Sequence, residues 1–304
     1  MQSQEQVIID IFLVNFMDIS LIENKIDISH LDQYAAIIGE SPSKGARSPK
    51  LWNAVFESEN RNCKMLPLDV KEENIIILLN DLNKDKKFIG GAIAVPYKEI
   101  VAKWLGDNVT PEAKKIGAVN CLFRNSKGEL QGTNTDGEAS LRTFVDEFGS
   151  VQNKIIMILG VGGAGKAVIS YFSDSANSII VFSRSKDGQE YAKKINVDWK
   201  DWNYINDYID RVDVVINCTS VGFGDQEMSS PLSKKQITSL KTTTIVFDII
   251  YHPLQTKLLN IAINSGISTF NGLSMNLEQA VLAYRHTVKS NQKLNEIRKI
   301  MSKI

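Results

Sequence analysis

The stretch Gly160-Val161-Gly162-Gly163-Ala164-Gly165 decides the fold of this 304-residue chain. It follows the apolar run 155–159 and precedes residues 166–172, whose pattern is typical of a helix. The G-x-G-x-x-G motif binds a dinucleotide when it lies between a strand and a helix, as it does here. The pyrophosphate lies on free N–H groups at the positive end of the helix. We therefore expect Gly160, Gly162, Gly163, Ala164 and Gly165 to bind a cofactor.

Two other interpretations of this stretch stay open. Residues Gly160 to Lys166 also fit the Walker A pattern G-x-x-x-x-G-K of nucleotide triphosphatases. That pattern requires Ser or Thr next, to hold Mg²⁺, and this chain has Ala167 instead. A glycine turn with a purely structural role is the third possibility. The local context favours the dinucleotide site over both.

The elements around the glycine turn predict an α/β fold with two domains. Short apolar strands alternate with helices after residue 150, which is typical of a doubly wound parallel sheet. We expect a Rossmann domain over residues 137–272 and an N-terminal α/β domain over residues 1–136, onto which helices in 273–304 fold back. The expected strands are 35–39, 88–96, 117–123, 130–132, 155–159, 178–182, 213–217 and 244–248. The expected helices are 73–82, 137–148, 163–174 and 187–195, and a further helix begins at Ser48.

Composition narrows the class of partner. Lys plus Arg equals Asp plus Glu, 35 each, which argues against nucleic acid or an anionic membrane as the partner. Cys63, Cys121 and Cys218 are far apart and show no metal-ligand spacing, so we expect no metal and a reducing compartment, the cytoplasm. The apolar run 7–14 lacks the cationic start of a signal peptide, and we expect it to form a buried strand or helix.

The end of the second Rossmann strand indicates which dinucleotide is bound. An acid there binds the ribose of NAD, whereas an arginine binds the 2′-phosphate of NADP. Here Ser183, Arg184, Ser185 and Lys186 follow the strand, and we expect them to bind NADP. Asp187 comes next, so NAD remains possible, and a solvated basic turn is the structural alternative.

Several further motifs in one order resemble the shikimate dehydrogenase family, from about residue 37 to residue 283. The segments that carry the resemblance are Ser48-Pro49, Val95-Pro96-Tyr97-Lys98-Glu99, Gly117-Ala118-Val119-Asn120, Gly132-Thr133-Asn134-Thr135-Asp136-Gly137, Asn217-Cys218-Thr219-Ser220-Val221-Gly222, Asp248-Ile249-Ile250-Tyr251, and Gly272-Leu273-Ser274-Met275 through Gln279-Ala280.

The resemblance implies an NADPH-dependent reduction of 3-dehydroshikimate. Lys98 and Asp136 would form the catalytic pair, because hydride transfer to a carbonyl carbon also needs a proton partner for the oxygen. It assigns the cyclic hydroxy acid to the N-terminal domain. The substrate residues it implies are Ser48, Asn120, Tyr251 and Gln279, and the further cofactor residues are Thr219, Ile249 and Gly272. A surface lysine and a helix-capping aspartate are the structural alternatives for the pair.

Three departures from the family pattern concern the substrate. The family loop has two serines two residues apart, and here Ala46 replaces the first while Ser48 is the second. Ala94 replaces a threonine, and Ala92 replaces an asparagine. Each change removes a polar group, which costs about 1–3 kcal/mol where its partner is left unpaired in a dry site. The pattern predicts a paralogue with an altered substrate. A milder departure is Gly188, which stands where a second arginine is common.

The sequence thus predicts an NADP-dependent alcohol dehydrogenase of shikimate dehydrogenase type, acting as a monomer or homodimer. A quinate or other cyclic hydroxy-acid dehydrogenase is the alternative within the same class. A non-catalytic NADP-binding sensor is the alternative from another class. Retention of Lys98 and Asp136 disfavours the sensor, because a sensor needs no proton carrier.

Overall fold

The computed structural model describes residues 17–304, and these form two compact units. Unit 1 comprises the residues up to Thr110, together with Val119–Thr133 and Ala283–Ile304. Unit 2 comprises Pro111–Ala118 and Asn134–Leu282. The apolar run 7–14, expected to be a strand or helix, lies outside the described residues.

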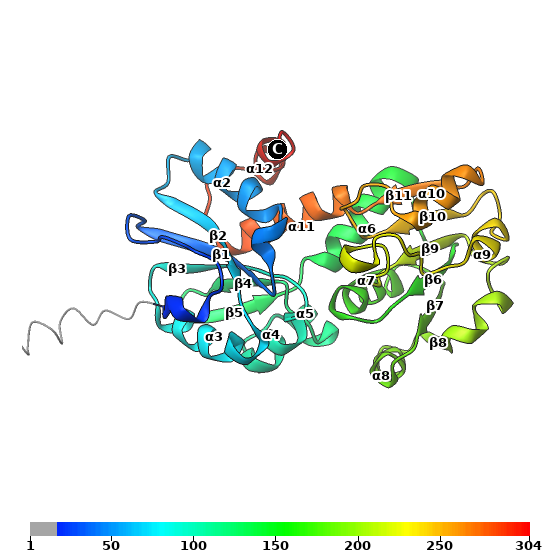
Figure 1. Cartoon of the computed structure of the whole chain (residues 1–304), viewed down its shortest axis with the longest axis horizontal. Helices are drawn as coiled ribbons and strands as arrows, with labels where there is room; N and C mark the ends of the chain where they lie inside the picture. The colour runs from blue at the N-terminus through cyan, green and yellow to red at the C-terminus, as the bar shows by residue number, and fades with distance from the viewer. Residues whose placement is uncertain (1–16) are drawn as a thin grey trace, which may run out of the picture. The chain divides into compact units, whose positions relative to one another are not determined.

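Unit 1 is built on a five-stranded mixed sheet (Figure 1). The strand order is β2-β1-β3-β4-β5, where β1 pairs in parallel with β2 and β3, and β4 pairs antiparallel with β3 and β5. The chain therefore leaves β1 and β3 toward opposite sides, which makes their shared carboxyl edge a topological switch point, where ligands bind in α/β sheets. The strands are β1 (Gln33–Gly39), β2 (Cys63–Asp69), β3 (Phe88–Ile93), β4 (Cys121–Arg124) and β5 (Leu130–Thr133).

The helices of unit 1 follow the strands in alternation. Pro49 occupies the first turn of α2, where its missing N–H costs nothing. The expected strand 88–96 is shorter in the structure, because the N–H of Tyr97 bonds back to the carbonyl of Ala94 and turns the chain after Ile93. The helices are η1 (Ile19–Leu21), η2 (Pro42–Lys44), α2 (Ser48–Ser58), η3 (Glu72–Asn74), α3 (Ile75–Lys84), α4 (Lys98–Leu105) and α12 (Leu294–Met301), while α11 (Leu273–Thr287) contributes to both units.

Unit 2 is built on a six-stranded, wholly parallel sheet in the order β11-β10-β9-β6-β7-β8. Its switch point lies between β6 and β9. This architecture confirms the predicted α/β fold class. The strands are β6 (Ile155–Leu159), β7 (Ser178–Ser183), β8 (Asp198–Asp201), β9 (Val214–Asn217), β10 (Ile245–Asp248) and β11 (Ser268–Asn271).

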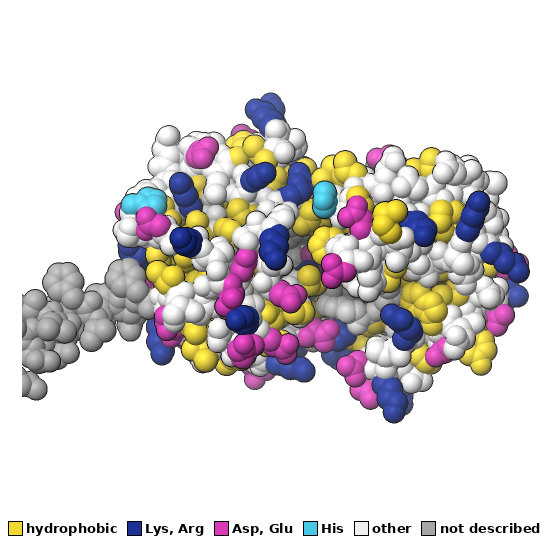
Figure 2. Space-filling model, in the orientation of Figure 1, with side chains coloured by type: hydrophobic (Ala, Val, Ile, Leu, Met, Phe, Trp, Pro, Cys, Tyr) yellow, Lys and Arg dark blue, Asp and Glu magenta, His cyan; other side chains and the backbone are white. Residues whose placement is uncertain are grey.

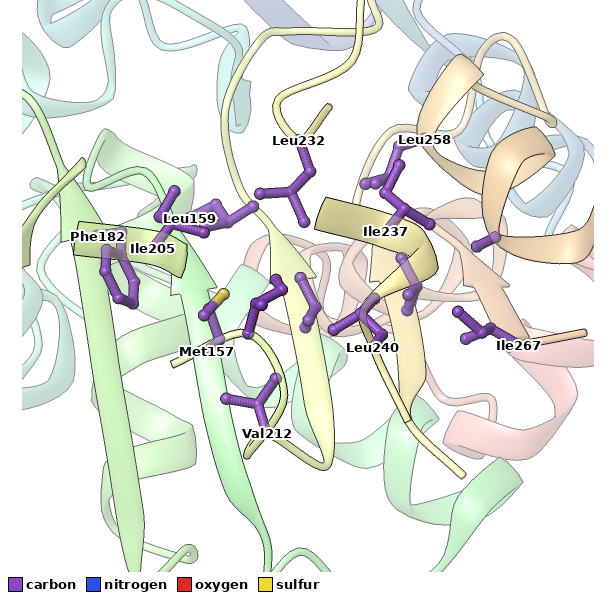
Figure 3. Packing of buried hydrophobic residues seen from close by; sticks show 14 of the residues in the cluster. Met157, Leu159, Phe182, Ile205, Val212, Leu232, Ile237, Leu240, Leu258 and Ile267 are labelled. Atoms are coloured by element: carbon purple, nitrogen blue, oxygen red, sulfur yellow. The ribbon is translucent and has the colours of Figure 1, made fainter. Parts of the chain in front are cut away.

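One hydrophobic core of unit 2 lies between the sheet and the segments that cover it (Figure 3). Met157 and Leu159 of β6 pack there with Ile205, Ile237 and Leu258, all at most 2% exposed. The central strands carry near-continuous apolar runs, as expected for a parallel sheet covered on both faces. The helices are α5 (Pro111–Ile116), α6 (Asp136–Phe148), α7 (Gly163–Ser173), α8 (Lys186–Lys194), η4 (Trp202–Asp207), η5 (Gly224–Gln226), α9 (Lys234–Thr238) and α10 (Lys257–Asn264).

The compact units differ from the ranges expected from sequence at three places, one of which is the assignment of residues 134–136, including Asp136, to unit 2. Residues 111–118 belong to unit 2, because Ile116 and Ala118 pack against Ala167 of α7. Residues 273–282 also belong to unit 2, and only the later part of the C-terminal segment, from Ala283 onward, belongs to unit 1.

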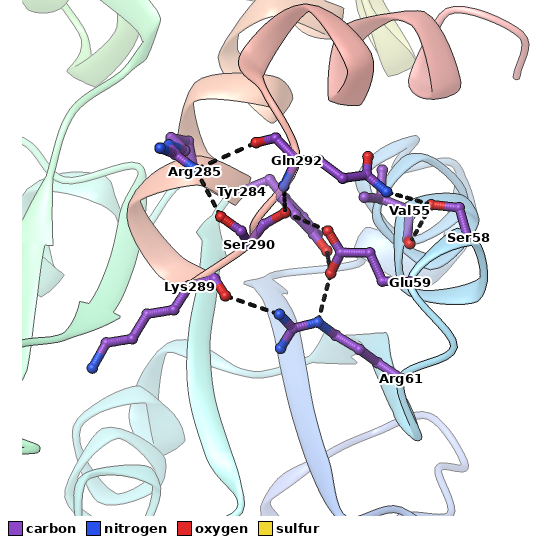
Figure 4. A network of polar contacts seen from close by, with 9 residues as sticks. All are labelled: Val55, Ser58, Glu59, Arg61, Tyr284, Arg285, Lys289, Ser290 and Gln292. Carbon is purple, nitrogen blue, oxygen red and sulfur yellow. Dashed lines mark hydrogen bonds and ion pairs between the residues drawn. The ribbon is translucent and has the colours of Figure 1, made fainter.

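The partly buried carboxylate of Glu59 ties the C-terminal segment to α2 within unit 1 (Figure 4). Glu59 accepts hydrogen bonds from Arg61 Nε at 2.5 Å, from the hydroxyl of Tyr284 at 3.1 Å and from the hydroxyl of Ser290. Arg61 also donates to the carbonyl of Lys289 at 2.9 Å. The network holds the turn between α11 and α12 against the end of α2.

No helix among residues 17–304 is both long and apolar enough to cross a membrane. The same described residues contain no cluster of three or more His, Cys, Asp or Glu side chains able to hold a metal ion. Cys63, Cys121 and Cys218 are buried free thiols. Positive and negative side chains are intermixed on the face of the molecule shown in Figure 2.

Candidate active site

The glycine turn has the geometry that a dinucleotide requires. Gly160 has a φ of +93°, which favours glycine, and a Cβ there would lie 2.8 Å from Thr219 Cγ2. A Cβ on Gly165 would lie 2.4 Å from the carbonyl oxygen of Gly160, so only glycine lets α7 pack this close to the turn. A Cβ on Gly162, by contrast, would meet no described atom within 4 Å. Gly162 thus leaves open space beside the backbone where the sequence predicts a pyrophosphate, and Gly163 begins α7.

The structure disfavours the Walker A alternative. Lys166 is 9% exposed, and its ammonium lies over the ring of Tyr191, 5.7 Å from the ring centre. The hydroxyl of Tyr191 donates to the carbonyl of Lys166 at 2.8 Å. Ala167 is fully buried against Ile116 and Ala118, where a metal-binding hydroxyl would have no access to a nucleotide.

The carboxyl end of β7 carries the four residues expected to bind the 2′-phosphate. Ser183 is buried, and its hydroxyl accepts a hydrogen bond from Trp199 Nε1 at 2.9 Å. Ser185 caps α8 by accepting from the N–H of Gly188. Arg184 and Lys186 are exposed, and the guanidinium of Arg184 lies over the indole of Trp202 at 5.8 Å. The sequence analysis did not identify Trp199 and Trp202 as part of this site. The one feature that could have indicated them is that two tryptophans lie three residues apart.

The loop after β9 is fixed by a buried polar network. Asn217 accepts from the hydroxyl of Thr219 at 2.7 Å and donates to Asp248 at 3.0 Å. Asp248, fully buried, also accepts from the hydroxyl of Thr256 at 2.7 Å and from the N–H of Ile250 at 3.2 Å. The network sets Thr219 beside Gly160 at the switch point.

The loop after β10 brings two more of the expected cofactor residues together. A Cβ on Gly272 would lie 1.9 Å from the carbonyl oxygen of Ile249, so this contact requires glycine. The N–H of Ile249 bonds to the carbonyl of Asn217 at 3.2 Å, which joins this loop to the one after β9. Tyr251 follows in the same loop and is partly exposed.

Asp248 predicts a specific pH dependence of stability. Burial raises its pKa from 3.8 to about 6, although three hydrogen bonds oppose this shift. As pH rises from 4 to 6 the unfolded chain loses this proton before the folded chain does, so the contribution to stability is present below pH 4 and is lost by pH 6. The loss is about 2–3 kcal/mol.

The Asp248→Asn variant should lack this decline, because the amide stays neutral and can still accept from Asn217 and donate to Thr256. Urea unfolding between pH 4 and 7 measures the free energy of unfolding of both proteins. The exposed Asp210→Asn variant is the control and should keep the decline. An equal decline in Asp248→Asn would assign it to another group.

Asp136 lies near the loop after β9. It is the first residue of α6, 4% exposed, and the preceding Thr135 occupies the capping position. Burial raises the pKa of the Cys218 thiol, and the carboxylates of Asp248 and Asp136 raise it further, which places Asp136 within electrostatic reach of Cys218. The hydroxyl of Thr135 donates to the carbonyl of Gln279 at 3.1 Å. Unit 2 therefore gathers Asp136 and Gln279 with the Thr219 loop.

Unit 1 gathers the other expected substrate residues at the carboxyl edge of its parallel strands. Lys98 begins α4, and its carbonyl accepts from the N–H of Val119 at 2.9 Å. The next residue, Asn120, is 2% exposed, and its carbonyl accepts from the N–H of Ile93 at the end of β3. Ser48 begins α2 and is 4% exposed. Lys98 thus belongs to unit 1 and Asp136 to unit 2.

Loop 40–47, which precedes Ser48, is held by a contact that the sequence did not reveal. The carboxylate of Asp69, at the end of β2, accepts from the N–H of Ser43 at 2.8 Å and from the Ser43 hydroxyl. Ala46 in this loop is partly exposed, as is Ala94 at the end of β3, whereas Ala92 is buried within the strand. A Cβ on Gly39 would lie 2.9 Å from Ala94 Cβ, so the ends of β1 and β3 approach closely.

These two sheets, with a glycine turn open at Gly162 and polar side chains at each switch point, define a two-unit α/β protein of the dinucleotide-binding class. Residues 37–122 match the family model "Shikimate dehydrogenase substrate binding domain", and residues 143–250 match the model "Shikimate / quinate 5-dehydrogenase". A shikimate dehydrogenase (NADP(+)) of Alkaliphilus oremlandii is 32% identical over 276 residues, covering 87% of this chain and 94% of that protein. The chain belongs to the shikimate dehydrogenase family, as its motifs predicted.

Solved structures agree with this assignment. The crystal structure of shikimate dehydrogenase from Aquifex aeolicus has 29% identity and a TM-score of 0.78, and the match covers 92% of this chain and all 100% of that chain. Shikimate 5-dehydrogenase of Listeria monocytogenes, in complex with shikimate and NAD, has 26% identity and a TM-score of 0.75, with 92% and 99% coverage.

Proposed function

We propose that the protein is an NADP-dependent oxidoreductase that reversibly reduces a cyclic ketone of the 3-dehydroshikimate type to its alcohol. The observation that carries the proposal is a dinucleotide turn open at Gly162 in the same chain as the family's lysine segment at Lys98. The relatives named as NADP(+)-dependent shikimate dehydrogenases support both the reaction and the cofactor.

The residues present fit a dinucleotide. The turn at Gly162 would hold the pyrophosphate, and Arg184, Ser185 and Lys186 would hold the 2′-phosphate. Thr219 and Ile249 would bind near the nicotinamide, which when bound supplies or accepts the hydride. These roles follow from the family motifs and from the open backbone at Gly162.

Lys98 and Asp136 would handle the proton. In the direction of reduction, the ammonium of Lys98 donates a proton to the carbonyl oxygen of the substrate, and in oxidation the amine takes it back. Asp136 would orient the reacting hydroxyl. Ser48, Asn120, Tyr251 and Gln279 would bind the carboxylate and hydroxyl groups of a small cyclic hydroxy acid. The proposed assembly is a monomer or a homodimer, and the proposed compartment is the cytoplasm, where the three thiols stay reduced.

The Arg184→Ala variant tests the cofactor assignment. Loss of a charged hydrogen-bonded contact should weaken NADP by about 1.5–3 kcal/mol, which is at least about tenfold, and barely change NAD. Isothermal titration with both dinucleotides measures the effect. The Lys193→Ala variant, an exposed lysine in the last turn of α8, is the matched control and should bind both cofactors as the unmodified protein does. Equal affinity of the unmodified protein for NADP and NAD would contradict the assignment.

Quinate or another cyclic hydroxy acid is the second candidate substrate. Ala46, Ala92 and Ala94 favour a different or less hydroxylated acid than shikimate, because each lacks a polar group that the family pattern places before Ser48 or Lys98. A panel of cyclic hydroxy acids, followed by the absorbance of NADPH, ranks the candidates by kcat/KM. Turnover of none of them by a protein that binds NADP would instead favour the non-catalytic sensor.

A further inference from the structure

β8 and the start of η4 lie beside the carboxyl end of β7, and the proposed function gives them no role. β8 pairs in parallel with β7, with Ser183 opposite Asp201. Trp202, the next residue, therefore comes abreast of Arg184, and the guanidinium lies 5.8 Å from the centre of its ring. Asp201 fixes the start of η4 by accepting from the N–H of Asn203 at 2.9 Å.

A cation–π contact with the indole of Trp202 orients Arg184 without using its hydrogen-bond donors. Within residues 17–304, no hydrogen bond or ion pair occupies the guanidinium N–H groups, and the side chain is exposed. A cation over tryptophan contributes about 0.5–1 kcal/mol at an exposed site. The guanidinium is thus held near Trp202, while its N–H donors are left for an anion that accepts two parallel hydrogen bonds.

The neighbouring helix turn contributes no second guanidinium at position 188. A Cβ on Gly188 would lie 2.3 Å from the hydroxyl oxygen of Ser183, which Trp199 Nε1 holds in place. Asp187, exposed beside it, adds a negative charge. Affinity for a phosphate here depends on how well the one arginine is oriented in advance.

We infer that Trp202 is a positioning residue for cofactor selectivity, holding Arg184 so that its donors meet the 2′-phosphate of NADP. The inference rests on the proposed use of NADP. Removing the indole should weaken NADP about two- to fivefold, because the arginine regains its conformational freedom before binding, and should change NAD by less than about twofold.

A double-mutant cycle tests the inference by titration of the full-length protein with NADP and NAD. The variants are Trp202→Ala, Trp202→Phe, Arg184→Ala and the double variant Trp202→Ala/Arg184→Ala. The phenylalanine ring should keep most of the NADP affinity. In the double variant the loss of the indole should have no further effect, because its partner is already gone. Trp104→Ala, which removes an indole from unit 1, is the control and should leave both affinities unchanged.

The outcomes separate the inference from the proposed function. An unmodified protein without a preference for NADP would overturn the proposed cofactor and the inference together. A preference for NADP that Trp202→Ala leaves unchanged in size would overturn the inference alone. Equal losses for NADP and NAD, or an additive loss in the double variant, would likewise overturn it, because they would show that Trp202 only stabilises the fold.

Discussion

Replacing Lys98 by alanine is expected to lower kcat by about 10²–10⁴-fold, to the limit of detection, and to leave the affinity for NADP nearly unchanged. Lys98 lies in unit 1 at the start of α4, whereas the glycine turn that would hold the dinucleotide lies in unit 2. Steady-state rates with the best hydroxy acid of the panel, together with an NADP titration, measure the two effects separately.

Lys103→Ala is the matched control for this variant. Lys103 lies in the last turn of the same helix and is exposed, so its removal should change kcat little. Residual activity of Lys98→Ala within a few-fold of the unmodified enzyme would show that another group carries the proton. A Lys98→Ala protein that neither turns over nor binds NADP would indicate a folding defect, which the thermal unfolding curve would reveal.

The second expected result is a kcat/KM for shikimate about 10²-fold below that for the preferred substrate. Ala46, Ala92 and Ala94 each lack a polar group, and three losses of about 1 kcal/mol combine to this factor if they add. The Ala46→Ser/Ala94→Thr double variant should recover roughly 10- to 30-fold of the loss. Both positions are partly exposed, and Gly39 leaves room beside Ala94, so the variant is expected to fold.

Ala54→Ser/Ala102→Thr is the control for this pair. It makes the same two chemical changes on α2 and α4, at partly exposed positions inside the helices, and should not raise activity on shikimate. Rapid turnover of shikimate by the unmodified protein would remove the paralogue interpretation. The substrate of this enzyme would then be shikimate, as in an ordinary shikimate dehydrogenase.

The sequence predicted the apolar strands and missed the polar ones. β6, β7, β9 and β10 are apolar runs in the middle of the sheet, where burial on both faces dictates the pattern. β8 and β11 lie at the edges and read DWKD and STFN, which no periodicity marks as strands. β2 contains Pro67, which argues against a central strand, and it is indeed an edge strand.

The same limit applies to the site. The glycine turn was predicted from its own strand and helix, and Lys98 from a family motif, because both follow strands that are themselves recognisable. Trp202 and Asp69 escaped, because each acts across strands: one meets Arg184 through the pairing of β7 and β8, and the other holds Ser43 through the pairing of β1 and β2. Such contacts depend on which edges come together, and local sequence does not encode this.

During translation, unit 2 is completed before unit 1. All of unit 2 has been synthesised once Leu282 is added, whereas unit 1 still lacks Ala283–Ile304. The buried rings of Trp52 and Phe56 pack against Tyr284, so this part of α2 waits for its partner while the whole of unit 2 is translated. At about 5–20 residues per second that wait lasts on the order of tens of seconds. We expect the nascent chain to expose these apolar rings during this time, and the hydrogen bond between Ser290 and Glu59 can form only after residue 290 has been added.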